Sequence, residues 1–330
     1  MSVVVPVVPD QFRLARPSGP LHGTGRVSLS LDRRGVRVAL ALLWFLDGAL
    51  QLQPAMFTRS FADQVVAPAA TGQPSWVAWL VLHSAHLVAS HPFASDLGFA
   101  LVQLLLGLLL LVPRTARAAL VASVVWATGV WVVGEGLGGI AGGTASILTG
   151  APGAALLYGV LALAAWPLGG ATGGLGRGEP AGAWFPRIWA ALWVALGLST
   201  LLPANGSSSK LAGQLTQVAG TVPAWLGRVD DAVASVVRSS GPVGFALLVA
   251  MPLAVGLCGL GQGRIRRVAA WGGVVVALAT WVVGESFGQL GSGSATDPNT
   301  GPLLVVAALA LLGTVRGPDR PPEFGHGPTG

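Results

Sequence analysis

Residues 97–112 read LGFALVQLLLGLLLLV, an apolar run without a charged side chain. A helix needs about 20 mainly apolar residues to cross the hydrocarbon core of a bilayer. The run extends to roughly 94–113, and a turn with Arg114 and Arg117 separates it from a second apolar run at 115–134. This pair predicts two antiparallel transmembrane helices joined by a short basic turn.

The composition of the whole chain agrees with this prediction. Apolar residues make up 52% of the 330 residues and charged residues only 10%, against about 25% charged in typical soluble domains. The net charge of +6 does not indicate a nucleic-acid partner, because the basic residues fall between the hydrophobic runs. Cys258 is the single cysteine, which excludes an intramolecular disulfide. The arginine-, alanine- and glycine-rich composition is typical of a bacterial protein encoded by a GC-rich genome.

Eight segments meet the length for a membrane span or come close to it. They lie at roughly 36–53, 94–113, 115–134, 152–168, 186–202, 242–260, 265–284 and 301–315. We therefore expect five parts. These are a flexible basic cytoplasmic tail at 1–35, a four-helix membrane unit at 36–168, a cytoplasmic linker at 169–185, a second four-helix unit at 186–315 and a flexible cytoplasmic tail at 316–330.

The placement of the basic residues predicts the orientation, because loops on the cytoplasmic side of membrane proteins are enriched in Lys and Arg. With the N-terminus inside, fifteen basic residues fall on the inner side. Only Arg59, Lys210, Arg228 and Arg238 fall outside. Both termini are predicted to be cytoplasmic, in a multi-pass protein of the cell membrane.

The two halves of the chain repeat each other at a shift of 150 residues. Trp131-Val-Val-Gly-Glu135 recurs as Trp281-Val-Val-Gly-Glu285, and Arg114 and Pro152 fall on Arg264 and Pro302. An even number of spans in each unit gives both units one orientation. The predicted fold is an all-α transmembrane bundle, with eight spans as two tandem parallel four-helix repeats.

Each unit has a long outer segment between its first two spans, at 54–93 and 203–241. In the second, the apolar residues from Val222 to Val237 share one helical face, which predicts an amphipathic helix on the outer surface. In the first, Trp76, Trp79 and His83 share a face in the same way. Residues 74–91 are apolar enough that a segment entering the membrane is the alternative.

Asp47 is an acidic residue inside the first span, and Gln51 lies one turn later on the same face. An intramembrane carboxylate is costly unless it faces a bundle interior or a polar cavity. Two interpretations follow, namely a proton or ligand site, or a hydrogen bond between helices. The second unit has no acid at the matching stretch, so a functional Asp47 would mean that the halves have diverged.

Glu135 and Glu285 each end the third span of their unit on the outer side. The helix macrodipole opposes a carboxylate at a helix C-terminus, so water, an arginine, a metal or protonation must compensate. Each glutamate opens a glycine-rich loop, with eight glycines in 134–153 and five in 284–301. These loops can pack against a helix or against a ligand, and neither is a P-loop.

His83, His86 and His91 form the only histidine cluster of the sequence. Imidazoles at i and i+3 can bind one metal, and Asp96 or Glu135, two further predicted outer-face acids, could complete the sphere. Haem ligation is also possible in principle. The alternative is that these histidines lie unliganded at the membrane interface.

The four-helix unit resembles the DoxX-like membrane proteins, over most of 36–168 and weakly over 186–315. The resemblance lies in the arginine-led first span, the outer amphipathic segment, Asp96 at the start of the second span, and the Gly107 to Arg117 stretch. It implies an accessory role in quinone-linked or thiol redox chemistry and assigns no catalytic residue. The chain also resembles uncharacterised actinobacterial integral membrane proteins, which implies no activity.

Three functions therefore remain open. The first is a binding, transport or accessory subunit of the cell envelope with an outward-facing polar pocket. The second is a DoxX-like redox protein that uses quinone, haem or metal, and the third is a structural scaffold. Whether the protein is an enzyme is left open. The expected partners are the lipid bilayer and either other membrane subunits or further copies of the chain, and no nucleic acid.

Overall fold

The computed structural model describes residues 29–167 and 179–315. Within these ranges the chain forms twelve α-helices and no strand. Residues 1–28 of the predicted tail at 1–35, the predicted tail at 316–330, and residues 168–178 in and beside the predicted linker lie outside the described residues. The all-α prediction is confirmed for the described chain.

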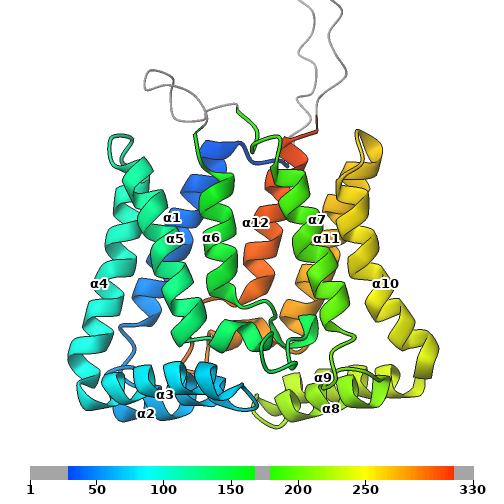
Figure 1. Ribbon diagram of the computed structural model, residues 1–330, viewed down its shortest axis with the longest axis horizontal. Helices are drawn as coiled ribbons and strands as arrows, with labels where there is room; N and C mark the ends of the chain where they lie inside the picture. Colours follow the sequence, from blue (N-terminus) through cyan, green and yellow to red (C-terminus); the bar gives the residue numbers. More distant parts are fainter. Residues whose placement is uncertain (1–28, 168–178, 316–330) are drawn as a thin grey trace, which may run out of the picture.

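Eight of the helices run side by side between the two ends of the bundle (Figure 1). They are α1 (Arg33–Leu50), α4 (Pro92–Leu111), α5 (Ala116–Val133), α6 (Ala154–Ala164), α7 (Phe185–Ser199), α10 (Gly241–Gly259), α11 (Arg264–Val282) and α12 (Thr300–Gly313). Each coincides with one of the eight apolar segments of the sequence. α4, α5, α10 and α11 are long and apolar enough to cross a membrane. α6, α7 and α12 are apolar but shorter.

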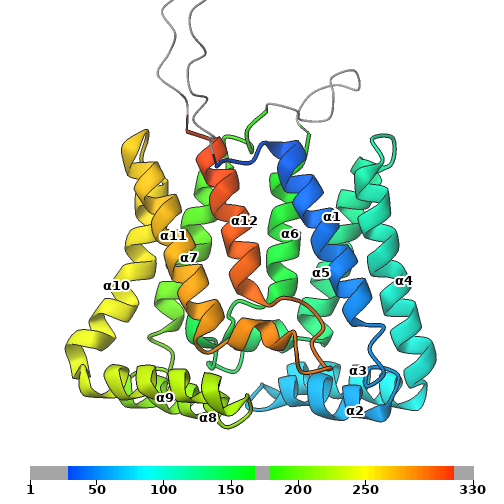
Figure 2. The ribbon, with the colours of Figure 1, turned by 180° about the vertical axis from the view of Figure 1, so that it is seen from behind.

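The remaining helices lie across one end of the bundle (Figures 1 and 2). They are α2 (Arg59–Phe61), the π-helix η1 (Ala62–Val66), the 3-10 helix η2 (Ala67–Ala70), α3 (Ser75–Ser90), α8 (Ser208–Ala219) and α9 (Ala224–Ser239). Both outer segments of the sequence are therefore helical. The long segment α3 lies across the bundle instead of running along the other helices.

Polar contacts fix α3 and α9 to the ends of the long helices. The Ser84 hydroxyl of α3 donates to the Val133 carbonyl at 2.7 Å. In the other half, an Asp230 carboxylate oxygen of α9 accepts from the Gly284 N–H at 3.0 Å. Both crosswise helices are thus held against the loops that follow α5 and α11.

Glycines allow the same close packing in two helix pairs. A Cβ atom on Gly48 of α1 would lie 2.7 Å from Leu104 Cγ of α4, and one on Gly197 of α7 would lie 2.8 Å from Leu253 Cγ of α10. The absence of a side chain lets both pairs approach closely, as small residues do in membrane helix pairs. The helix pairs α1–α4 and α7–α10 are therefore built alike.

One hydrophobic core runs through both halves. Trp44 and Tyr158 pack with their ring centres 4.3 Å apart, and the Trp44 indole donates to the Ser123 hydroxyl at 3.1 Å. Trp189 and Trp193 form a second aromatic pair at 5.2 Å. α6 and α12 contact each other in the middle of the bundle, so the halves are joined along the centre.

The bundle has two different ends. The start of α1, the end of α12 and the α4–α5 and α10–α11 turns lie at one end, which we call the arginine end (Figure 1). The described chain carries nine arginines there, namely Arg33, Arg34, Arg37, Arg114, Arg117, Arg187, Arg264, Arg266 and Arg267. The opposite end, which we call the cavity end, carries the crosswise helices and four basic residues.

Candidate functional site

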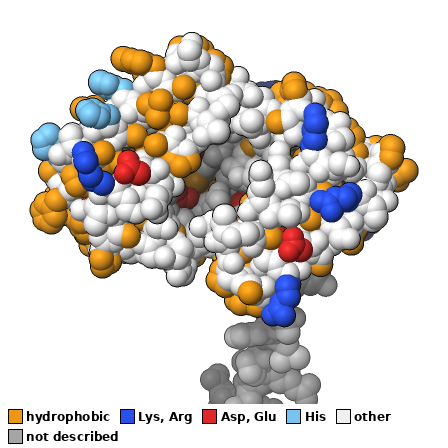
Figure 3. Space-filling view, turned by 90° about the horizontal axis from the view of Figure 1, so that it is seen from below, with side chains coloured by type: hydrophobic (Ala, Val, Ile, Leu, Met, Phe, Trp, Pro, Cys, Tyr) orange, Lys and Arg blue, Asp and Glu red, His pale blue; other side chains and the backbone are white. Residues whose placement is uncertain are grey.

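The two glycine-rich loops meet at the cavity end, where they surround a cavity of about 440 Å³. Figure 3 views this end and shows a central hollow with acidic side chains at its floor. The first loop contains η3 (Gly136–Gly139) and η4 (Ile147–Thr149), and the second contains η5 (Ser286–Gln289). Residues of both halves line the cavity, namely Val65, Glu135, Gly138, Gly139, Thr144, Ala145, Ser146, Thr149, Gly150, Ala151, Gly153, Ala154, Gly288, Gln289, Ser294, Ala295, Thr296, Asp297 and Asn299.

Glu135 and Glu285 each bind the N-terminus of the helix that follows their loop. A Glu135 oxygen, Oε1, accepts from the Ala155 N–H at 2.9 Å, in the first turn of α6. Glu285 Oε2 accepts from the Gly301 N–H at 3.1 Å, in the first turn of α12. A helix N-terminus has unsatisfied N–H groups and a positive partial charge. This contact provides the compensation that the sequence demands for both carboxylates.

Two prolines fix the register of the loops. The Trp131 indole N–H donates to the Pro152 carbonyl at 2.8 Å, and the Trp281 indole donates to the Pro298 carbonyl at 2.8 Å. The structural counterpart of Pro152 is therefore Pro298. The sequence match of Pro152 with Pro302, at a constant shift of 150 residues, is wrong at this position. The stretch from Trp281 to Pro298 is four residues shorter than the stretch from Trp131 to Pro152. The second loop therefore has a different conformation, although the same kinds of contact hold its two ends.

Glu135 and Glu285 differ in how many of their carboxylate oxygens accept a hydrogen bond. Glu285 accepts a second hydrogen bond, from the Thr300 hydroxyl, and it does not line the cavity. Ala154 stands at the matching first position of α6 and has no hydroxyl. Glu135 Oε2 is buried without a hydrogen-bond partner, and Glu135 lines the cavity. Burial raises the pKa of Glu135 to about 8 and that of Glu285 to about 7.

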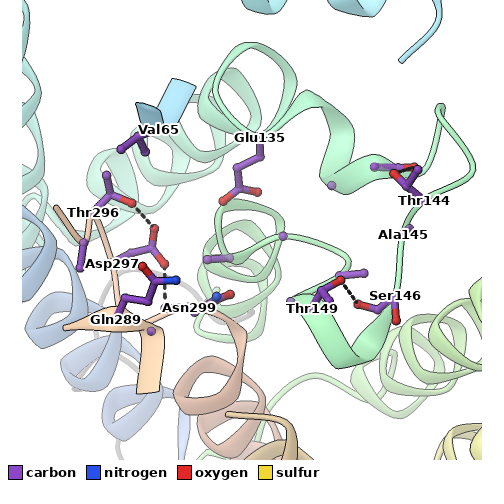
Figure 4. A pocket seen from close by; sticks show the side chains of 18 of the residues that line it. Val65, Glu135, Thr144, Ala145, Ser146, Thr149, Gln289, Thr296, Asp297 and Asn299 are labelled. Carbon is purple, nitrogen blue, oxygen red and sulfur yellow. Dashed lines mark hydrogen bonds between the residues drawn. The ribbon is translucent and has the colours of Figure 1, made fainter. Parts of the chain in front are cut away.

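Asp297 is the second acid of the cavity, and it comes from the other half (Figure 4). Its Oδ1 accepts from the Asn299 N–H at 2.7 Å, and its Oδ2 accepts from the Thr296 hydroxyl at 2.7 Å. Burial raises its pKa, and its charge raises the pKa of Glu135 in turn. The described residues that line the cavity include no Lys, Arg or His. Sequence reasoning did not select Asp297, although Asp-Pro-Asn within a glycine-rich loop was the available signal.

Each loop is also held by the opposite half. The Gln53 amide, after α1, donates to the Ala295 carbonyl at 3.0 Å, and the Asn205 amide, after α7, donates to the Ala145 carbonyl at 2.5 Å. The acceptors Ala145 and Ala295 are 150 residues apart. Gly150 has φ +89°, and a Cβ atom there would lie 2.7 Å from Asn299 Oδ1, so glycine lets the loops touch.

Asp47 and Gln51 are buried in the bundle, with exposed fractions of 2% and 4%. The Tyr158 side chain, also 2% exposed, lies beside the Asp47 carboxyl group. Asp47 Oδ1 and Gln51 Oε1 have no hydrogen-bond partner. Asp47 lies close enough to Glu135 and Asp297 for their charges to interact with it. The predicted polar pair therefore belongs to the interior, near the acids of the cavity.

Asp96, one of the three predicted outer-face acids, is buried. It lies in the second turn of α4 and is 0% exposed, and both of its carboxylate oxygens lack a hydrogen-bond partner. It is not a lining residue of the cavity. Its side chain is packed between helices and not presented at the surface.

The histidines lie outside the site. His83, His86 and His91 are exposed, and His83 stacks on Trp79 with the ring centres 5.2 Å apart. Figure 3 shows the histidines at one edge of the cavity end. In the part of the chain that the structure describes, no three His, Cys, Asp or Glu side chains are placed to hold one metal ion. The structure thus does not assemble the predicted metal set, because Asp96 is buried and Glu135 faces the cavity.

Comparison of the chain with protein families, with curated protein sequences and with solved structures gives no match. The site is therefore interpreted from its own chemistry. Its elements are two acidic side chains from opposite halves, described lining residues that include no basic side chain, and walls of glycine, hydroxyl and amide groups.

Proposed function

We propose that the protein crosses the cell membrane eight times, as two tandem parallel four-helix units with both termini in the cytoplasm. The order of elements supports the duplication, because η3 and η5 begin 150 residues apart and each precedes the last helix of its half. The nine arginines at the arginine end support the orientation. In this arrangement the cavity end faces outward, and the shorter helices α6 and α12 lie in the centre of the bundle.

The cavity supports a role as a binding, transport or accessory subunit that receives a polar ligand from outside. The observation that carries this proposal is the unpartnered Oε2 of Glu135 in a cavity that both halves build. A buried acceptor without a hydrogen bond costs stability, so such groups call for a functional reason. Cavities of about 300–1,000 Å³ are the usual size of small-molecule sites.

Cysteine labelling in intact cells tests this proposal. Cys258 is replaced by alanine, and single cysteines are placed at Thr149, an exposed cavity residue, or at Gln262, an exposed residue in the α10–α11 turn. A membrane-impermeant maleimide should label Thr149→Cys in intact cells and Gln262→Cys only after permeabilisation. The reverse pattern would overturn the orientation. Protection of both in intact cells would contradict an open outer cavity.

The purified protein also separates this proposal from redox or metal function. A visible spectrum and a metal analysis of the detergent-solubilised full chain should show neither a Soret band nor stoichiometric metal. A bound haem or a stoichiometric metal would overturn the proposal in favour of the DoxX-like redox role. Unchanged cell phenotypes in both Asp47→Asn and Glu135→Gln variants would favour a scaffold.

A further inference from the structure

The charge of the cavity narrows the class of its ligand. Glu135 and Asp297 approach it from opposite halves, and none of the described residues that line it is basic. Asp47 does not line the cavity but lies close enough to these two acids for their charges to interact with it; its carboxyl group is 2% exposed and has an unpartnered oxygen. Buried charges in proteins are normally paired. A positively charged ligand would supply the missing partner.

The shape and lining of the cavity discriminate between kinds of cation. A volume of about 440 Å³ exceeds the need of a single metal ion, and a calcium site takes 6–8 oxygen ligands closely around the ion. The described residues offer no group of three acids or histidines for such an ion. Quaternary ammonium groups are typically held against aromatic rings, and none of the described lining residues is aromatic. A primary ammonium group, which brings its own N–H donors, fits carboxylate, hydroxyl and carbonyl acceptors.

We propose that the cavity binds a small primary amine in its ammonium form, with Glu135 Oε2 and Asp297 as the acidic acceptors. This inference rests on the proposed function, because it names the ligand of the same cavity. The backbone of Gly138, Gly139 and Gly150 also lines the cavity. Ser146 and Thr149 supply hydroxyl groups from the same loop.

A proton and the amine compete for Glu135 in this arrangement. Asp297 from the second loop and Asp47 from α1 lie close enough to Glu135 for their charges to interact, and none of the described lining residues is basic. Burial and the charge of Asp297 raise the pKa of Glu135 to about 8. The empty site therefore holds a proton on Glu135 at pH 7, and the ammonium group displaces it. Affinity for the amine should rise between pH 6 and pH 8.5.

Isothermal titration calorimetry on the purified full chain in mild detergent tests the ligand class. The probes are ethanolamine and 1,4-diaminobutane. The comparison compounds are ethylene glycol and 1,4-butanediol, which lack charge, together with choline and Ca²⁺. Binding of at least one primary amine, at least tenfold tighter than every comparison compound, supports the proposal. Equal binding of a diol, choline or Ca²⁺ overturns it, and so does the absence of amine binding.

Substitutions inside and outside the cavity test whether the amine binds there. Glu135→Gln keeps an acceptor for the Ala155 N–H and should weaken amine binding by about tenfold or more, since hydrogen bonds to charged groups are worth about 1.5–3 kcal/mol. Asp297→Asn should act in the same direction. Glu285→Gln is the matched control outside the cavity and should leave the affinity unchanged. Equal losses in Glu135→Gln and Glu285→Gln would refute the assignment to this cavity.

Proton release provides a readout that a purely structural role would not change. Titrations at pH 7 in buffers of different ionisation enthalpy should show close to one proton released per amine in the wild type. Glu135→Gln should release clearly fewer protons, and equal release in both proteins would contradict proton exchange at Glu135.

The cysteine labelling separates the proposed outward-facing cavity from the proposed amine ligand. A labelled Thr149→Cys without amine binding refutes only the ligand class, and a protected Thr149→Cys refutes the outward-facing cavity itself.

Discussion

Glu135 and Glu285 bind the N-termini of α6 and α12 in the same way, yet only Glu285 has both carboxylate oxygens hydrogen-bonded. The difference depends on one neighbouring position, where Thr300 has a hydroxyl and Ala154 has none. One glutamate is thereby a satisfied structural group, and the other lines the cavity and keeps a buried oxygen without a hydrogen bond. The predictions below separate these two roles.

The stability of the ligand-free protein should depend on pH through Glu135. Its folded-state pKa of about 8 lies above the ordinary value of 4.5, so the folded protein binds this proton more tightly than the unfolded chain. The contribution is fully present below pH 4.5 and is lost as the pH rises towards about 8. The Tm in detergent should fall from pH 5 to pH 9 and fall less in Glu135→Gln. A Tm that falls equally in the variant contradicts this role.

Asn205 should contribute more to stability than Gln53. Asn205 is 0% exposed, donates to the carbonyls of Ala145 and Ser199, and accepts from Gln214 at 2.6 Å. Asn205→Ala leaves the buried Ala145 carbonyl unpaired, at about 1–3 kcal/mol, and also removes the part-buried hydrogen bonds to Ser199 and Gln214. Gln53 is only half-buried, so water can replace it in Gln53→Ala. Thermal unfolding should show the larger loss of Tm for Asn205→Ala, and the opposite ranking would refute this view of the loop contacts.

Gly48 and Gly197 should not tolerate a side chain. A Cβ atom at Gly48 would also lie 3.1 Å from the Leu104 backbone nitrogen, and one at Gly197 would lie 3.1 Å from the Val249 carbonyl oxygen. Alanine at either site should destabilise the fold by about 1–3 kcal/mol through overpacking. Gly98 of α4 has no atom within 4 Å of the added Cβ. Gly98→Ala is therefore the control and should be neutral or stabilising by up to about 1 kcal/mol.

Gly150→Ala should lower the affinity of the cavity for amines, which Gly241→Ala should not do. Gly150 has φ +89° and Gly241 has φ +55°, but a Cβ atom at Gly241 meets nothing within 4 Å. Both substitutions carry the strain of left-handed backbone, roughly 1–2 kcal/mol. Only Gly150→Ala also collides with Asn299 at the cavity wall. Amine affinity should fall in Gly150→Ala and stay unchanged in Gly241→Ala. An equal fall in both would show that the Asn299 contact is not important.

Hydropathy could predict the long elements because span length is set by simple periodicity and composition. All eight apolar segments contain a helix, and the turn with Arg114 and Arg117 separates α4 from α5 as expected. The recurrence of Trp-Val-Val-Gly-Glu correctly pointed to two equivalent glutamates. These features depend on local sequence, and a single chain shows them directly.

The cavity could not be predicted in the same way, because it depends on how two distant loops pack. Asp297 lies 162 positions after Glu135 in the chain (297 − 135) and reaches the same cavity only through the contacts between the halves. A constant shift of 150 also hid the shorter second loop, in which Pro298 replaces Pro302 as the partner of the tryptophan. The burial of Asp96 could not be predicted for a related reason, since a position near a helix end does not determine whether the side chain is buried.

The crossed hydrogen bonds of Gln53 and Asn205 bear on the origin of the site. Neither half can hold its own loop in this way, so in the proposed duplication a lone ancestral unit would have needed a second copy of itself. Such a pair carries two identical glutamate sites, and any mutation changes both at once. Fusion into one chain removes that constraint. One glutamate can then keep its supporting role while the other is altered independently to suit a ligand.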